Sequence, residues 1–367
     1  MNYRYNTYPY GHDYGNSKTC GIANIGGATC ELSMPSTLAE GSLEDLQSKL
    51  AEDNLRQLGI FNERSHIISV NGNEFFVGDL AIEQSPSANI AELTSRGDLS
   101  RYWSVRSLAM LLATSGTLIK DREYGLIVVA GLPIATHIDA NIQAVKNVLD
   151  GDHEFILDGV KRIAHVSVKK MIAEGSGANV AHGAIGKVKA GIVDIGGRTT
   201  DIYMVNGLSP ILDQCRSLDI GVETAIDSLI EAFEKEFRYP LSATDAAKLQ
   251  LAYIGEKRYD MVATVRNADA DLQRVDDLLN KSLTDVSRKL FGFIKRSWSG
   301  SLKSDVVAPD AEYILLVGGG AYYFDESVKA LFPKRLIIPH RPECANATGY
   351  ARLALHFFQR ESKEMAV

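Results

Sequence analysis

Hydrophobic and polar residues along this chain form patterns that predict strands, hairpins and helices. The apolar run Gly125-Leu-Ile-Val-Val-Ala-Gly-Leu-Pro133 predicts a buried central strand. Apolar residues spaced by three and four positions over residues 271–298 predict a long amphipathic helix. Two apolar segments, residues 66–70 and 74–78, flank Asn71-Gly72, a strong signal for a hairpin. Strands and helices are therefore both expected.

Other segments predict further elements with weaker patterns. Residues 101–115 have the apolar content of a buried helix, whereas charged residues among the leucines of residues 43–58 predict an exposed helix. Residues 138–149 predict another helix, which precedes a hairpin around Asp158-Gly159 and a strand over residues 160–168. The first ten residues are polar and rich in tyrosine. We expect a loosely ordered leader there, with an adhesive intermolecular contact as the alternative.

Size and charge narrow the class of protein. The 367 residues, 45% of them apolar, leave room for two domains. A net charge of -7 argues against a general nucleic-acid-binding protein, for which a basic surface is expected. No apolar run approaches the ~18 residues of a membrane span, and the N-terminus has no apolar signal core. We therefore expect a cytoplasmic protein with no membrane contact and no direct contact with nucleic acid.

The cysteines and histidines suggest no metal site. The four cysteines are far apart and form no C-x-x-C pair, so we expect reduced thiols in the core and neither a zinc site nor a disulfide framework. They are Cys20, Cys30, Cys215 and Cys344. The eight histidines have no H-x-x-x-H or H-E-x-x-H spacing, so no histidine metal site is predicted.

The most informative stretch is Ala190-Gly-Ile-Val-Asp194-Ile-Gly196-Gly197-Arg-Thr199-Thr200-Asp-Ile-Tyr-Met-Val205. It predicts an apolar strand, a glycine turn and a second strand, before the turn-forming pair Asn206-Gly207. Adjacent glycines let backbone N–H groups point into one concavity, and the threonine hydroxyls add donors, so the turn can hold phosphate oxygens. Asp194, at the strand end, can hold Mg²⁺ through water. The alternative is a plain hairpin whose glycine pair only forms a bulge.

A similar arrangement lies near the N-terminus, in Gly11-His-Asp13-Tyr-Gly15-Asn16-Ser17-Lys18. An Asp is followed two positions later by Gly, then by small polar residues and by a Lys that enters a strand. A lysine ammonium suits the outer phosphates of a nucleotide. Two such hairpins suggest two related lobes that face a nucleotide from opposite sides. The chain has no Walker pattern, and no G-x-G-x-x-G follows a strand.

A third glycine turn follows the short apolar strand Tyr313-Ile-Leu-Leu-Val317. The three residues Gly318, Gly319 and Gly320 would allow the backbone to approach a flat base or an α-phosphate closely. A helix is expected to begin at about Asp325.

These turns, in this order, with Ala345-Asn-Ala-Thr-Gly349-Tyr near the C-terminus, resemble the phosphate and adenosine motifs of the actin, sugar-kinase and heat-shock chaperone ATPase superfamily. The segment Phe75-Phe-Val-Gly-Asp-Leu-Ala81 is similar to the Val-Gly-x-x-Ala signature of bacterial and archaeal actin-like proteins. Within the superfamily, Asp194-Ile-Gly-Gly-Arg-Thr-Thr-Asp201 most resembles the ParM/StbA plasmid-partitioning group and archaeal actin-like proteins.

The resemblance implies an α/β, actin-like ATPase fold of two related lobes with a nucleotide cleft between them. Residues 1–170 would form domain I, with a small inserted lobe at about residues 31–100. Residues 171–345 would form domain II, and residues 346–367 a C-terminal helix that returns to domain I. The polar first strand, broken by Pro9, departs from the family pattern and leaves the start of the first lobe open.

The resemblance also assigns roles to individual residues. Glu174 would orient the water that attacks the γ-phosphate, although a Glu at a helix start also complements the helix dipole. Asp13 and Asp194 would be catalytic with it and hold Mg²⁺ through water. Glu223 would approach the ribose or adenine, with a surface Glu in a first helical turn as the alternative. The nucleotide would be ATP, with GTP as the alternative, and its contacts would be Gly15, Asn16, Ser17, Lys18, Gly196, Gly197, Arg198, Thr199, Thr200, Gly221, Glu223, Gly318, Gly319, Gly320 and Tyr322.

The function implied is that of an ATPase that polymerises head to tail into filaments and segregates plasmid DNA through a DNA-binding adaptor protein. Nucleotide binding would close the cleft, and the closed form would pack into an open-ended polymer. The alternatives are a non-filamentous ATP-binding regulator and a small-molecule kinase of the same superfamily. A kinase needs an additional acidic base, for which the sequence has no separate motif.

Overall fold

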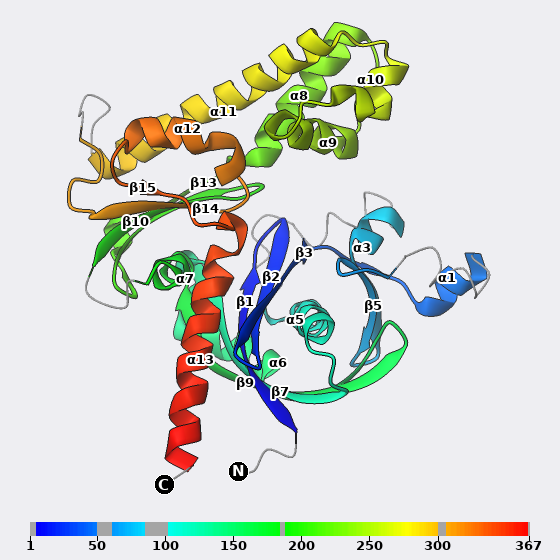
Figure 1. Cartoon of the computed structure of the whole chain (residues 1–367), viewed down its shortest axis with the longest axis vertical. Coiled ribbons are helices and arrows are strands. Elements are labelled where there is room, and N and C mark those ends of the chain that lie inside the picture. Colours follow the sequence, from blue (N-terminus) through cyan, green and yellow to red (C-terminus); the bar gives the residue numbers. More distant parts are fainter. Residues whose placement is uncertain (1–4, 50–60, 85–101, 184–187, 300–305, 366–367) are drawn as a thin grey trace. The chain divides into compact units, whose positions relative to one another are not determined.

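The computed structural model describes residues 5–49, 61–84, 102–183, 188–299 and 306–365. The chain forms two compact units, each of which is drawn in Figure 1. Unit 1 consists of Met1–Lys187, Gly207–Pro210 and Glu343–Val367, and unit 2 consists of Val188–Asn206 and Ile211–Pro342. Each unit contains a sheet with helices packed against it, so both have a mixed α/β architecture.

Unit 1 is built on a nine-stranded sheet with the strand order β3-β2-β1-β7-β9-β8-β5-β6-β4. The strands are β1 (Asn6–Tyr14), β2 (Lys18–Ile25), β3 (Ala28–Pro35), β4 (Leu38–Glu40), β5 (Ser65–Val70), β6 (Asn73–Gly78), β7 (Glu123–Leu132), β8 (Gly151–Leu157) and β9 (Val160–Ala173). The predicted central strand is confirmed, because β7 lies parallel to β1 on one side and to β9 on the other. Its residues after Glu123 are all buried, as expected for a parallel strand inside a sheet. The segment Gly207–Pro210 carries the two-residue strand β12 (Ser209–Pro210).

Helices cover both faces of this sheet. They are α1 (Leu43–Lys49), α3 (Asp79–Gln84), α5 (Val105–Leu118), α6 (Asp139–Leu149), α7 (Ser176–Ala181) and α13 (Ala345–Met365). Figure 1 shows the sheet curled around α5, which contacts strands from both ends of the strand order. Residues 107–116 of α5 are all buried, which confirms the predicted buried helix. Helix α13 runs beside β1, β7 and α7.

Two predicted hairpins of unit 1 are confirmed. Asn71 and Gly72 connect β5 to β6 with φ values of 52° and 75°, the backbone that a type I′ turn requires. Asp158 and Gly159 connect β8 to β9 with φ values of 51° and 78°. The strand predicted over residues 160–168 continues to Ala173, because β9 stays paired with β7 along its second half.

The expectation of a loosely ordered leader is wrong for the part that the structure describes. Strand β1 begins at Asn6 and lies between β2 and β7 in the sheet. Tyr10 is fully buried, and its hydroxyl donates a hydrogen bond to Oγ1 of Thr114 at 2.7 Å. Tyrosines can fill a core in this way when each hydroxyl finds a partner. The strand therefore looks polar in sequence although its second half is buried.

Unit 2 contains the parallel pair β10 (Lys189–Ile195) and β14 (Tyr313–Val317) in the strand order β11-β10-β14-β15. The remaining strands are β11 (Thr200–Asn206), β13 (Arg216–Leu218), which pairs with β11, and β15 (Leu336–Ile337). The helices are α8 (Val222–Phe237), α9 (Ala243–Ile254), α10 (Ala263–Asn267), α11 (Leu272–Ser299) and α12 (Ala321–Leu331). The predicted long amphipathic helix is confirmed as α11.

Helix α12 begins earlier than expected. The sequence predicted a start near Asp325, but the helix begins at Ala321, immediately after the three glycines. The N–H of Gly320 donates to the carbonyl of Ile195 at 2.7 Å, so the glycine turn is held by β10 and leads directly into the helix.

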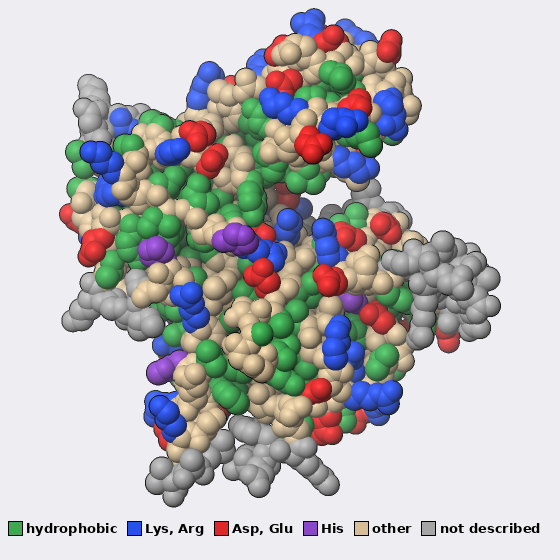
Figure 2. All heavy atoms as spheres, viewed as in Figure 1, with side chains coloured by type: hydrophobic (Ala, Val, Ile, Leu, Met, Phe, Trp, Pro, Cys, Tyr) green, Lys and Arg blue, Asp and Glu red, His purple; other side chains and the backbone are tan. Residues whose placement is uncertain are grey.

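Helix α11 joins two apolar clusters of unit 2. Its C-terminal half packs with β10, β14 and α12, and its N-terminal half packs with α8 and α9. On the face shown in Figure 2, basic side chains over α9 to α11 lie among acidic ones. Lys257 pairs with Asp276 at 3.0 Å, and Arg258 with Asp260 at 3.1 Å.

The expectation that all cysteines are reduced is wrong. Cys20 in β2 and Cys344, just before α13, form a disulfide across 324 positions of sequence. Both cysteines are buried in a small apolar cluster with Ile22 and Ala347. Tertiary folding of unit 1 brings the two segments together, so local cysteine spacing carried no sign of the bond. Cys30 and Cys215 are free thiols.

Some expectations fall outside the described residues. These are the second half of the helix predicted over residues 43–58, the part of the predicted small lobe at residues 85–100, and Arg101 at the start of the predicted buried helix. Among the residues that are described, no helix is both long enough and apolar enough to cross a bilayer.

Candidate functional site

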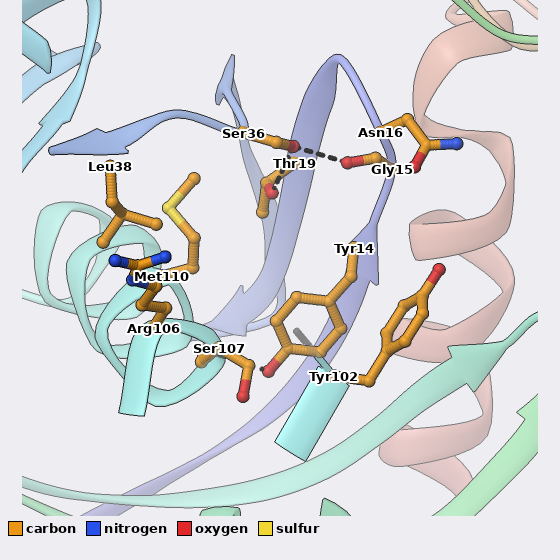
Figure 3. Close-up of a pocket in the computed structure, with 10 residues that line it drawn as sticks. All are labelled: Tyr14, Gly15, Asn16, Thr19, Ser36, Leu38, Tyr102, Arg106, Ser107 and Met110. Carbon is orange, nitrogen blue, oxygen red and sulfur yellow. Dashed lines mark hydrogen bonds between the residues drawn. The ribbon is translucent and has the colours of Figure 1, made fainter. Parts of the chain in front are cut away.

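The first candidate turn lies in unit 1, where β1 turns back into β2. Residues 15–17 separate the two strands, and Lys18 is the first residue of β2. A Cβ on Gly15 would lie 2.3 Å from the carbonyl oxygen of Lys18, so only glycine fits this turn. Ser36 holds the turn from outside, because its Oγ donates to the carbonyl of Gly15 at 2.6 Å (Figure 3). The N–H of Ser36 also donates to the carbonyl of Ser17 at 3.0 Å.

Asp13 lies at the end of β1, opposite Cys20 on β2. Its exposed fraction is 9%, and this burial raises the pKa of the carboxyl to about 7. A buried carboxylate of this kind is stabilised by a nearby cation, which would lower its pKa again. The residue therefore has the chemistry expected of a carboxylate that faces Mg²⁺ through water.

A small cavity lies behind this turn, between β1, the start of β4 and the first turns of α5 (Figure 3). Its volume is about 50 Å³, enough for a few water molecules and far too small for a nucleotide. The hydroxyl of Tyr14 donates to the carbonyl of Ser107 at 3.2 Å, and the Tyr14 ring lies edge-on to Tyr102. The cavity is lined by Tyr14, Gly15, Asn16, Thr19, Ser36, Leu38, Tyr102, Arg106, Ser107 and Met110. Nothing in the sequence predicted it.

Glu174 follows the last residue of β9 and precedes α7. Its N–H donates to the carbonyl of Leu132 at 2.9 Å, which ties it to the end of β7. The side chain is half-buried. Gly175, with φ of 83°, turns the chain from β9 into α7. Glu174 and the 15–18 turn therefore both belong to unit 1.

The second candidate turn, residues 196–200, lies in unit 2 between β10 and β11 and is tied to the first turn of α8. The N–H groups of Val222 and Glu223 donate to the carbonyls of Gly196 and Gly197, at 3.1 and 2.7 Å. A Cβ on Gly221 would lie 2.5 Å from the carbonyl oxygen of Gly197, so this close approach requires glycine. A plain hairpin would not be held by a separate helix in this way.

Arg198 and Glu223 form an ion pair across this junction, with Nε and Oε2 2.9 Å apart. Both side chains are about one third exposed. The pair joins residues that the sequence assigned to separate motifs, and it presents a guanidinium and a carboxylate side by side. Guanidinium groups suit phosphate oxygens, and carboxylates accept hydrogen bonds from ribose hydroxyls.

The hydroxyls of the two threonines have partners within unit 2. Thr199 donates to Oδ2 of Asp201 at 3.0 Å. Thr200 is fully buried, and its hydroxyl donates to the carbonyl of Ile220 at 2.8 Å. Thr200 thus fastens the turn to the segment that precedes α8. Burial raises the pKa of Asp201 above its ordinary value.

The third candidate turn follows β14 and lies against Asp194. Asp194 pairs with Val317 in the parallel register of β10 and β14, so Gly318 lies beside the Asp194 carboxylate. A Cβ on Gly318 would be 2.4 Å from Oδ1 of Asp194. A Cβ on Gly319 would meet nothing within 4 Å, and Tyr322 is 45% exposed. The carboxyl ends of parallel strands are the usual place for ligand-binding turns.

Unit 2 therefore brings together three segments that the sequence predicted separately: the 196–200 turn with Asp194, the start of α8, and the 318–320 turn. Unit 1 independently carries Asp13, the 15–18 turn and Glu174. In the part of the chain that the structure describes, no group of three or more His, Cys, Asp or Glu residues is arranged to hold a metal ion by itself. Mg²⁺ held through water by single carboxylates is a different arrangement, and the acidic residues present fit it.

Comparison with known proteins identifies the class. Residues 11–177 match the family described as the N-terminal domain of actin-like proteins. Residues 192–330 match the family described as the C-terminal domain of the MreB-like archaeal actin homologue. No curated protein matches the chain. Both units thus carry matches to actin-like families, and the chain combines an actin-like N-terminal domain with an archaeal MreB-like C-terminal domain.

Solved structures that share the fold of this chain include ParM proteins and an archaeal actin homologue. Ta0583, an archaeal actin homologue in complex with ADP, is 21% identical with a TM-score of 0.69, over 96% of this chain and 99% of that chain. ParM in a 15-stranded filament from Clostridium botulinum is 22% identical with a TM-score of 0.66, over 96% and 99%. Bacillus thuringiensis ParM with ATP is 15% identical with a TM-score of 0.65, over 96% and 100%. The predicted actin-like fold is confirmed.

Asn346 is a residue that the sequence did not assign to the site. The side chain of Asn346 contacts Gly175, which directly follows Glu174, although Asn346 and Glu174 are 172 positions apart. The absence of a capping side chain at Gly175 was the one local sign that a partner would come from elsewhere.

Proposed function

We propose that this chain binds Mg-ATP, hydrolyses it and polymerises into filaments that segregate plasmid DNA. The observation that carries the proposal is the junction in unit 2, where two glycine turns and the start of α8 meet beside Asp194 at the carboxyl ends of β10 and β14. Its close backbone approaches at Gly221 and Gly318 require glycine, and the proposal assigns phosphate oxygens to the glycine turns built there. A structure of this kind fits a nucleotide better than it fits a plain hairpin.

Each group of residues has a proposed part in binding. The 15–18 turn of unit 1, with Lys18, and the 196–200 turn of unit 2 bind phosphates of the same nucleotide. Glu223 and Gly221 bind the ribose or the base, and the 318–320 turn with Tyr322 lies against the base or the α-phosphate. Domain I (residues 1–170), domain II (residues 171–345) and the returning helix (residues 346–367) form the two lobes of this proposal. ATP is the expected nucleotide, and GTP is the alternative.

Hydrolysis is assigned to Glu174, with Asp13 and Asp194. The Glu174 carboxylate orients a water molecule and accepts its proton as the water attacks the γ-phosphate. Asp13 and Asp194 would hold Mg²⁺ through water, and the ion would neutralise phosphate charge. The buried position of Asp13 supports this role, because a cation offsets the cost of burying its charge.

Filament formation is inferred from the relatives. The Clostridium botulinum ParM forms a 15-stranded filament, and this chain shares its fold over nearly its whole length. A head-to-tail contact between identical chains produces an open-ended polymer when its rotation does not close a ring. A DNA-binding adaptor protein would link such a filament to a plasmid, so the chain itself needs no direct contact with DNA or with a membrane.

The central test is sedimentation of the purified chain at high concentration with ATP, with ADP and without nucleotide. Pelleting that depends on ATP supports the filament, and no nucleotide-dependent pelleting removes it. Hydrolysis without pelleting would favour the non-filamentous regulator. Transfer of phosphate to a small molecule would favour the kinase.

Two variants test the assigned residues. Asp194→Ala should lose affinity for Mg-ATP, and unchanged affinity would count against the metal assignment. Asp310→Ala is its control, because Asp310 is an exposed carboxylate of unit 2 in an ion pair with Lys189. Glu174→Ala should bind ATP and release little phosphate. Glu154→Ala, an exposed partner of Lys161 in unit 1, should behave as wild type.

A cytoplasmic location is part of the proposal. The Cys20–Cys344 disulfide is unusual for a reducing cytoplasm, where most such bonds are transient or occur in hyperthermophiles. Counting free thiols in cells quenched rapidly with acid tests this point. Two free thiols per chain would mean that the bond is present in the cell, and four would mean that it forms after isolation.

A further inference from the structure

Helix α7 begins with a residue that cannot cap it. Its first turn directly follows Glu174, and the N-cap position is Gly175, which has no side chain. The first N–H groups of a helix have no partner within the helix and are normally satisfied by an N-cap side chain. Gly175 has φ of 83°, a conformation that other residues rarely adopt. The turn therefore needs an acceptor from another part of the chain.

Asn346, in the first turn of α13, supplies that acceptor. Its Oδ1 accepts hydrogen bonds from the N–H of Gly175 at 3.2 Å and from the N–H of Ala178 at 3.1 Å. Ala178 is the third residue of α7, the position to which an N-cap side chain usually bonds. Asn346 is only 6% exposed, so solvent is a poor substitute for its carbonyl. The Asn346 side chain therefore caps α7 in place of Gly175, although it lies 171 positions away in sequence.

The surroundings leave Asn346 little freedom to move. A Cβ on Gly349 would lie 1.8 Å from the carbonyl oxygen of Gly177, so α13 and α7 are in direct backbone contact. The disulfide between Cys20 and Cys344 fixes the chain two residues before Asn346. The backbone of Glu174 is therefore held on both sides. Its own N–H donates to Leu132 of β7, and the N–H of the following residue, Gly175, donates to Asn346.

We propose that Asn346 is a positioning residue for ATP hydrolysis. It fixes the backbone that carries Glu174, and the Glu174 carboxylate in turn orients the attacking water. This inference rests on the proposed function of Glu174 as the water-orienting residue. Small displacements of such a group reduce catalysis strongly, because the reaction depends on geometry.

The test compares the kcat of ATP hydrolysis, the affinity for ATP and thermal unfolding in one set of variants. Asn346→Ala removes the acceptor, and its kcat should fall about tenfold or more while the Kd for Mg-ATP changes less than about twofold. Asn346→Asp keeps an acceptor that a helix N-terminus favours, so it should recover most of the rate. If Asn346→Ala does not fold, Asn346→Ser takes its place in the comparison, because its hydroxyl is on a shorter side chain and reaches the N–H groups of α7 less well.

A second variant on the same helix controls for general damage to α13. Thr348 donates from Oγ1 to the carbonyl of Cys344 at 2.9 Å, and Thr348→Val removes that bond while leaving the Asn346 amide in place. Its kcat should stay at the wild-type value. The double variant Glu174→Ala/Asn346→Ala should be no slower than Glu174→Ala alone, because Asn346 acts only through Glu174.

The outcomes separate this inference from the function on which it rests. A slow Glu174→Ala together with a wild-type rate in Asn346→Ala overturns the role of Asn346 alone. The role of Asn346 is also overturned if the fold-loss of kcat in the double variant equals the product of the fold-losses in the two single variants. A wild-type rate in Glu174→Ala overturns the assignment of Glu174, and the role of Asn346 with it.

Discussion

Gly318 lies directly beside Asp194: a Cβ added to Gly318 would stand 2.4 Å from Oδ1 of the carboxylate and equally close to the carbonyl oxygen of Ile195. The residue also has φ of 81°. Two independent constraints therefore require glycine at the point where β14 ends next to β10. The neighbouring Gly319 has neither constraint.

Gly318→Ala should lower the free energy of unfolding by roughly 1–2 kcal/mol from its backbone conformation alone, with a further loss from the overlap. It should also weaken Mg-ATP binding, because Asp194 must move. Gly319→Ala is the matched control for stability, and its free energy of unfolding should stay within about 0.5 kcal/mol of wild type. Urea unfolding of both variants gives the stability comparison, and nucleotide titration of Gly318→Ala against wild type measures binding. Equal losses of stability at the two positions would contradict the geometry.

The Arg198–Glu223 pair should matter for binding far more than for stability. The pair is partly exposed, and exposed ion pairs contribute about 0–1 kcal/mol. Arg198→Ala should therefore unfold at nearly the wild-type temperature, while its Kd for Mg-ATP rises about tenfold through the loss of a charged phosphate contact. Arg258→Ala, which breaks a similar pair with Asp260, should leave the Kd unchanged. A Kd that is insensitive to Arg198 would remove this residue from the site.

The disulfide should stabilise unit 1 substantially. It links positions 324 residues apart, and closing so long a loop in the unfolded chain contributes up to about 5 kcal/mol. Adding a reductant, or replacing Cys20 by Ser, should lower the melting temperature, whereas Cys30→Ser should not, because Cys30 is a free thiol. Differential scanning calorimetry with and without reductant gives the comparison. If the melting temperature does not respond to reductant, the two thiols are not bonded in solution.

Asp245 gives a prediction about pH. Its carboxylate accepts a hydrogen bond from the hydroxyl of Thr264 and pairs with Lys248, and the Thr264 bond is the main reason that its pKa lies below the ordinary value. A carboxyl with a lowered pKa stabilises the fold above its unfolded pKa of about 4, and this contribution is lost as the pH falls further. Thr264→Val should therefore destabilise most near pH 7 and progressively less below about pH 4.

Urea unfolding between pH 3 and pH 7 tests this expectation. Thr284→Val provides the comparison, because Thr284 bonds to the amide of Asn280 and not to a carboxylate. Its effect should not vary with pH over this range. A Thr264→Val effect that is the same at every pH would show that the bond does not favour the ionised form of Asp245.

The elements that the sequence predicted well are those set by neighbouring residues. Asn71-Gly72 formed the expected turn because both residues accept positive φ, and α11 formed because its apolar residues repeat at helical spacing. The cap of α9 has an equally local cause, because the Ser242 side chain accepts a bond from the N–H of Asp245 three residues later. In each case the cause lies within a few residues of the effect.

The features that were missed depend on partners far away in the chain. Tyr10 looked too polar for a core strand because Thr114, which satisfies its hydroxyl, is 104 positions away. Cys20 and Cys344 carried no local spacing signal. Asn346 caps a helix whose own N-cap is glycine. The turns of the site were recognised one by one, but the ion pair that joins Arg198 to Glu223 could be known only from the structure.

The bond between Cys20 and Cys344 also changes how the chain carries mechanical load. Every residue of unit 2 lies between these two positions in sequence. A pull applied at the two ends of the polypeptide would pass through the sulfur bridge and would bypass the backbone of unit 2 altogether. In a polymer under tension, only the segments outside residues 20–344 could be drawn out by such a pull, so unit 2 is mechanically shielded as long as the cysteines stay oxidised.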